Sequence, residues 1–214
     1  MGMSKLKVLN VVLAVVLLIL IILTLFCMKQ DGKTEANASG SGKSAIEIIH
    51  KRTSVRDYTE KKVTRDQLET LVRAGMAAPT AMNKQPWLFV AIDDKEILNS
   101  LGAVLPYGKM LLKSTAAIIV CGDMNKVLDG HGKEMWIQDC SAASENILLS
   151  ATDLGLGAVW TGVYPSEDRV SAVKKVLNLP TNLIPLNVIP VGYPAGDTNP
   201  KDKWKAENLH WNKW

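Results

Sequence analysis

Two periodicities of apolar residues run through the chain after residue 44 and predict an irregular alternation of helices and strands. Apolar residues recur every three or four positions between Thr64 and Pro79, which predicts an amphipathic helix there. Similar spacing predicts helices over 46–52, 95–104, 134–154 and 166–177. Short continuous apolar runs predict buried strands over 87–92, 116–121, 158–161 and 186–191. This order of elements predicts an α+β fold.

Local signals mark where some of these elements begin and end. Ser44 with Glu47, and Thr64 with Gln67, have the spacing of a capping box, in which two side chains satisfy the first backbone N–H groups of a helix. Pro190 lies inside the last apolar run and cannot donate to a ladder. We therefore expect the last strand to lie at an edge or to contain a bulge.

The amino-terminal part has a different pattern, an almost unbroken apolar run from Val8 to Cys27. A helix of about 20 apolar residues can cross a bilayer. The alternative is a cleaved secretory signal, whose apolar core is normally about 7–15 residues long. We predict a membrane anchor over 1–27, a flexible linker rich in Gly, Ser and Asn over 28–43, and a folded domain over 44–214. Lysines on both sides of the run leave open which side of the membrane the domain faces.

Composition excludes several other functions. The formal net charge is +4, yet no basic helix or aromatic-basic array predicts nucleic-acid binding. The three histidines are far apart, and the three cysteines lack a CxxC spacing, so no metal site is predicted. Cys121 and Cys140 fall in apolar segments and are expected in the core.

The segment from Arg52 to Arg56 carries the strongest chemical signal. Its two guanidinium groups and two hydroxyls, on Arg52, Thr53, Ser54 and Arg56, suit phosphate oxygens. The alternative is a helix end with solvated charges. A second polar cluster follows one helix later, where Asn83 and Gln85 could read the edge of a flat heterocycle.

Two further segments add to this pattern. Gly162, in the Trp160–Val163 segment, allows close approach of a ligand to the backbone, although an ordinary turn is the alternative. Lys201 and Lys203 could clamp a phosphate or could simply be solvated. No Gly-x-Gly-x-x-Gly follows a strand, and there is no nucleophile elbow or HExxH motif. No catalytic side chain stands out, which suits chemistry carried by a bound cofactor.

Taken in order, these segments resemble the FMN-dependent nitroreductases. The resemblance spans about residues 44–214 and rests on segments 52–58, 77–87, 155–160, 191–194, 201–203 and 209–212. It implies a mostly antiparallel sheet flanked by helices, FMN as cofactor, and NADH or NADPH as electron donor. It also implies a homodimer with two FMN sites, each built from both chains, for which the helix 134–154 and the C-terminal segment are the expected interface elements.

The resemblance also implies roles for individual residues. Arg52, Thr53, Ser54, Lys201 and Lys203 would hold the phosphate and ribityl end, and Arg56 would stabilise negative charge on the reduced flavin. Asn83 would bind the pyrimidine edge, while Trp160, Thr161 and Gly162 would lie near N5. The pocket would be lined by Pro79, Thr80 and Gln85.

The implied reaction is a ping-pong, two-electron reduction of a small acceptor such as a nitroaromatic or a quinone. One alternative is a reductive dehalogenase resembling iodotyrosine deiodinase. That family has Glu where this chain has Gln85, and it has a long lid for which residues 106–114 leave no room. The other alternative is a non-catalytic, membrane-tethered flavin-binding or redox-sensing module.

Overall fold

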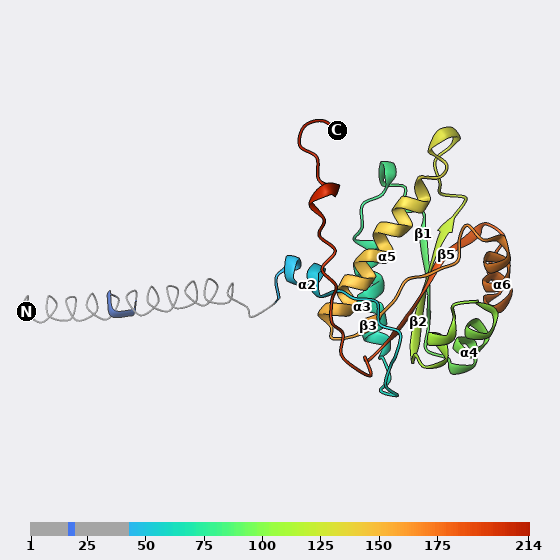
Figure 1. Cartoon of the computed structure of the whole chain (residues 1–214), viewed down its shortest axis with the longest axis horizontal. Helices are drawn as coiled ribbons and strands as arrows, with labels where there is room; N and C mark the ends of the chain where they lie inside the picture. Colours follow the sequence, from blue (N-terminus) through green and yellow to red (C-terminus); the bar gives the residue numbers. More distant parts are fainter. Residues whose placement is uncertain (1–16, 20–42) are drawn as a thin grey trace, which may run out of the picture. The chain divides into compact units, whose positions relative to one another are not determined.

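The computed structural model describes residues 17–19 and 43–214, and residues Lys43–Trp214 form one compact unit (Figure 1). Of the predicted membrane-spanning run, only residues 17–19 are described, and the predicted linker over 28–43 lies outside the described residues except for Lys43. Within the described ranges, no helix has the length and apolar character needed to cross a bilayer. The predicted single-pass membrane localisation is corrected on this finding.

A five-stranded antiparallel sheet forms the centre of the 43–214 unit. Its strands are β1 (Trp87–Ile92), β2 (Ala116–Asp123), β3 (Gly157–Ala158), β4 (Thr161–Gly162) and β5 (Leu183–Gly192). They are ordered β1-β2-β5-β3, and β4 also pairs with β5. The predicted α+β class with a mostly antiparallel sheet is confirmed.

Helices cover both faces of this sheet (Figure 1). One core contains residues of α3 (Arg65–Met76) and α5 (Met135–Asp153), and the other contains residues of α4 (Lys95–Val104) and α6 (Glu167–Leu177). Strand β2 is buried throughout and supplies both cores alternately, with Ile118 facing the first and Ile119 the second. That alternation follows from the two-residue period of a strand and explains why β2 reads as a continuous apolar run.

Capping agrees with the sequence at one helix and partly at another. Around α3, the Thr64 side chain accepts from Gln67 N at 3.2 Å, and Gln67 Oε1 accepts from Thr64 N at 3.1 Å. The short helix α2 (Ala45–Lys51) has only half of its predicted box. Ser44 Oγ accepts from Glu47 N, but the Glu47 carboxylate pairs with Lys51 instead of reaching back.

The edge position predicted from Pro190 is wrong, because β5 lies between β2 on one side and β3 and β4 on the other. Pro190 is tolerated there because β3 pairs with Gly192 and Val191 and β4 pairs with Val188 and Asn187. Neither of these two strands pairs with Pro190. The predicted strand over 158–161 is therefore two short strands. The residues between them do not pair with β5, and this gap lies opposite Pro190. The alternative expectation of a bulge is met elsewhere, where the register of β2 and β5 shifts after Val120.

The two described cysteines are core thiols, as predicted. Cys121 and Cys140 are both fully buried, and Cys140 Sγ donates to the carbonyl oxygen of Cys121 at 3.6 Å. Burial raises the pKa of each thiol to about 12. Both therefore stay protonated and unreactive at neutral pH.

Candidate functional site

Arg52 is the C-cap of α2, and the rest of the Arg52–Arg56 segment continues as an extended segment that makes one isolated bridge to the sheet. Helix α2 ends at Lys51, and Ser54 then pairs in parallel with Ala158 of β3, with Val55 N donating to Ala158 O at 3.0 Å. Successive side chains of an extended chain point to opposite sides. Ser54 and Arg56 accordingly lie on one side and line a cavity with Arg52 and Thr53, while the Val55 side chain packs against Gly157 of β3.

Two close contacts hold this strand against the sheet. A Cβ added to Gly157 would lie 2.6 Å from Val55 Cγ1, and one added to Gly192 would lie 2.8 Å from Tyr58 Cδ1. Only glycine leaves room for these side chains. The Tyr58 hydroxyl donates to Val55 O at 2.7 Å and to Pro190 O at 3.3 Å. Burial raises the pKa of Tyr58, so this hydroxyl remains a donor over the physiological range.

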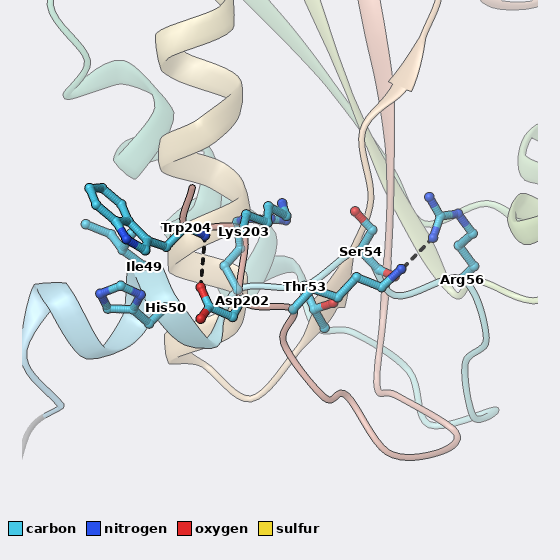
Figure 2. Close-up of a pocket in the computed structure, with 10 residues that line it drawn as sticks. Ile49, His50, Thr53, Ser54, Arg56, Asp202, Lys203 and Trp204 are labelled. Carbon is cyan, nitrogen blue, oxygen red and sulfur yellow. Dashed lines mark hydrogen bonds between the residues drawn. The ribbon is translucent and has the colours of Figure 1, made fainter. Parts of the chain in front are cut away.

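A cavity of about 510 Å³ opens beside the strand (Figure 2). It is lined by Ile49, His50, Arg52, Thr53, Ser54, Arg56, Lys201, Asp202, Lys203 and Trp204. The structure thus brings together two segments about 150 residues apart. Four of the lining residues are Lys or Arg and one is acidic, so the cavity presents positive potential to an anion.

Neighbouring residues orient the cations of the cavity. Arg52 is only 18% exposed, and its Nε lies 3.4 Å from Glu145 Oε1 on α5. Arg56 Nη1 donates to Ser54 O at 3.3 Å, as Figure 2 shows. The Asp202 carboxylate accepts from Trp204 N at 2.9 Å, which shapes the turn that carries the two lysines. The arrangement can bind a phosphate through guanidinium, ammonium and hydroxyl donors.

Sequence reasoning missed four of the lining residues, namely Ile49, His50, Asp202 and Trp204. Figure 2 shows Trp204 beside Ile49 and His50, at the end of the cavity away from Arg56. His50, Asp202 and Trp204 lie beside or between residues of the predicted phosphate-binding segments, and this closeness in sequence could have identified them. Ile49 carried no such signal, because the helical spacing of α2 assigned it to an apolar face. In the structure its side chain is 50% exposed.

The second predicted cluster does not line this cavity. Pro79, Thr80, Asn83 and Gln85 lie in the connection between α3 and β1, which contains the short 3-10 helix η1 (Ala81–Asn83). Gln85 Nε2 donates to Asn83 Oδ1 at 2.9 Å, and both side chains are exposed. The two amides therefore act as one unit that is accessible to a ligand.

The third predicted cluster lies at β4, opposite the centre of β5. The Thr161 hydroxyl is buried and has no hydrogen-bond partner among the residues that the structure describes. A Cβ added to Gly162 would meet no described atom closer than Trp160 Nε1 at 4.0 Å, so the backbone there is open to a neighbour. A buried hydroxyl without a partner calls for an explanation, and a bound water or ion is one.

Comparison with known proteins identifies the class of fold and site. The nitroreductase family model matches residues 49–193. A Methanothermobacter thermautotrophicus protein, provisionally named an NADH dehydrogenase/NAD(P)H nitroreductase, is 41% identical over 86% of this chain and 92% of its own length.

Solved structures agree with this match. A provisionally named NADH dehydrogenase/NAD(P)H nitroreductase from Bacteroides thetaiotaomicron has a TM-score of 0.76 and 45% identity, over 81% of this chain and 100% of that one. A nitroreductase from Desulfovibrio desulfuricans in complex with FMN, also provisionally named, has a TM-score of 0.69 and 27% identity, over 81% of this chain and 99% of that one. This chain belongs to the nitroreductase family.

Proposed function

We propose that this chain is an FMN-dependent NAD(P)H oxidoreductase that passes two electrons to a small, electron-poor acceptor such as a quinone or nitroaromatic compound. The observation that carries the proposal is the cationic cavity, where Arg52, Ser54, Arg56, Lys201 and Lys203 converge from distant parts of the chain. The nitroreductase relatives confirm an enzyme of the oxidoreductase class, with FMN as cofactor and a nicotinamide nucleotide as donor.

The residues present fit such a cofactor. A phosphate is an anion that accepts several hydrogen bonds, and the cavity supplies bidentate guanidinium, ammonium and hydroxyl donors. When bound, FMN supplies the two-electron carrier that connects the nicotinamide donor and the acceptor. The protein supplies position and electrostatics, which explains why no catalytic acid or nucleophile stands out in the sequence.

Burial and position separate the roles of the two arginines. Arg52 is largely buried, pairs with Glu145 and lines the same cavity as the two lysines, so we assign it to the phosphate end with Thr53, Ser54, Lys201 and Lys203. Arg56 is exposed at the other end of the same strand face. We assign it to the isoalloxazine, where a fixed cation favours the reduced, anionic form.

The remaining site residues fit a site completed by a second copy of the chain. The Asn83–Gln85 unit is exposed and lies outside the cavity, together with Pro79 and Thr80. The C-terminal segment 203–214 leaves Trp204, Leu209, Trp211 and Trp214 exposed, a set of apolar side chains that a partner could cover. We therefore propose a homodimer, with the Asn83 loop binding the pyrimidine edge and Trp160, Thr161 and Gly162 lying near N5.

Direct assay of the full chain tests this function. The purified protein is reconstituted with FMN, and oxidation of NADH and of NADPH is followed with a quinone, a nitroaromatic and a halogenated phenol as acceptors. Reduction of bound FMN by at least one nucleotide, followed by electron transfer to the quinone or nitroaromatic, is expected. Failure of both nucleotides to reduce bound FMN would sink the oxidoreductase proposal, and selective dehalogenation would favour the deiodinase-like alternative.

A further inference from the structure

The loop between α3 and β1 has an unfavourable backbone conformation. Met82, Asn83 and Gln85 have φ values of 49°, 53° and 48°, in the left-handed region that L-residues other than glycine rarely adopt. Met82 is 81% exposed, so packing of its side chain does not compensate. A strained loop persists only where the surrounding structure holds it, and such loops cluster at binding sites.

Bonds within the loop shape it but do not attach it to the rest of the protein. Gln85 N donates to Thr80 Oγ1 at 3.2 Å, and the Gln85 and Asn83 side chains are joined at 2.9 Å. Both partners of each bond move with the loop. At its C-terminal end the loop is bonded to the sheet, because Asp123 N donates to Pro86 O at 2.7 Å, and a further contact is needed to fix its N-terminal end.

Asp139 provides that contact from the long helix α5. Its side chain is 6% exposed, and its Oδ1 accepts a hydrogen bond from Ala81 N at 2.9 Å. A carboxylate is costly to bury unless it is hydrogen-bonded, and a charge-assisted bond is stronger than a neutral one. Asp139 thus joins the first residue of η1 to the long helix α5.

We propose that Asp139 is a positioning residue of the flavin site, which through the Ala81 N–H holds the loop so that Asn83 and Gln85 present their amides to the cofactor. This inference rests on the proposed function, because it assigns the two amides to FMN. Asp139 does not touch the cofactor in this scheme and acts only through the loop.

Helix α5 also anchors the other half of the site. Glu145, six residues after Asp139, pairs with Arg52 at 3.4 Å. Six residues correspond to about 9 Å along a helix. Each cluster therefore has its own contact with α5, and a change at Asp139 should release the amide loop without disturbing the cationic cavity.

The test compares Asp139→Ala with Asp139→Asn in the full chain. Asparagine keeps an oxygen acceptor for Ala81 N–H, and alanine removes it. If the fraction of loops in the binding conformation falls to a tenth, the apparent FMN affinity falls about tenfold. We expect this loss, a more negative midpoint potential of bound FMN, and faster amide exchange over 80–85 for Asp139→Ala. We expect values close to the original protein for Asp139→Asn.

Two further variants separate positioning from general stability. Asn146→Ala removes another bond from α5, the one donated to Ala74 O at 3.0 Å, and serves as the matched control. Ala81→Pro removes the donor from the loop side if Asp139→Ala does not fold. Thr80 has φ −136° and ψ 153°, a conformation compatible with a following proline, and the first helical position accepts one.

The outcomes are distinct. A protein that binds no FMN in its original form refutes the proposed function itself. If the original protein binds FMN and either Asp139→Ala or Ala81→Pro leaves its affinity and midpoint potential unchanged, the positioning role is wrong. An equal loss in Asn146→Ala would also overturn it, because the effect would then reflect helix packing in general.

Discussion

Gly157→Ala offers the sharpest test of how the fold builds the cationic cavity. The added Cβ would lie 2.6 Å from Val55 Cγ1, 2.7 Å from Val55 Cβ and 3.0 Å from Val55 Cγ2. Valine is branched at Cβ and cannot rotate out of the way, so the extended strand must move off β3. That movement also breaks the 3.0 Å bond from Val55 N to Ala158 O.

The cost follows from these contacts. Overpacking a tight interface costs roughly 1–3 kcal/mol, and a lost backbone hydrogen bond costs about 0.5–1.5 kcal/mol more. We therefore expect the free energy of unfolding to fall by roughly 1.5–4.5 kcal/mol, the sum of those two effects. Because Ser54 and Arg56 flank Val55, FMN affinity should fall as well.

The assay combines urea denaturation with FMN titration by fluorescence quenching. Gly196→Ala is the control for stability, since a Cβ there meets no described atom within 4 Å. Val55→Gly in the Gly157→Ala background removes every one of the short contacts and should recover part of the lost FMN affinity. A Gly157→Ala protein with the original stability and affinity would refute the proposed packing of the strand on β3.

Three other predictions follow from the site and the core. Arg56→Ala should leave FMN bound but slow its reduction by NAD(P)H, whereas Arg56→Lys should keep most of the rate. Stopped-flow absorbance measures both rates. A normal rate in Arg56→Ala would contradict the assigned role. Lys203→Ala should weaken FMN binding in a salt-dependent way. Lys205 does not line the cavity, so Lys205→Ala should leave FMN binding unchanged. Equal FMN affinities of the two variants would contradict the phosphate assignment. Cys121 and Cys140 have their pKa raised by burial from 9.0 to about 12, so their contribution to the free energy of unfolding should be constant below pH 9 and decline between pH 9 and 12. Urea titrations of Cys121→Ala with Cys140→Ala against the original chain measure it, and an unchanged difference across that range would contradict it.

The helices and strands were predictable because their signals are local. The Thr64–Gln67 box and the apolar spacing after it mark α3, and the run from Ala116 marks β2, since periodicity depends only on neighbouring residues. Strand order is not local, and this is why Pro190 misled the reading of β5. A proline reports only its missing donor, and the structure accommodates it opposite the gap between β3 and β4.

The sequence by itself determined the donors of the site, because guanidinium, ammonium and hydroxyl groups suit a phosphate wherever they lie. Only the tertiary structure decided that Lys201 and Lys203 face this strand and that the Asn83 loop lies outside the cavity and is held by Asp139. The physical reason is that these contacts join residues more than 50 positions apart, and such pairings are decided by packing of the whole sheet and its helices.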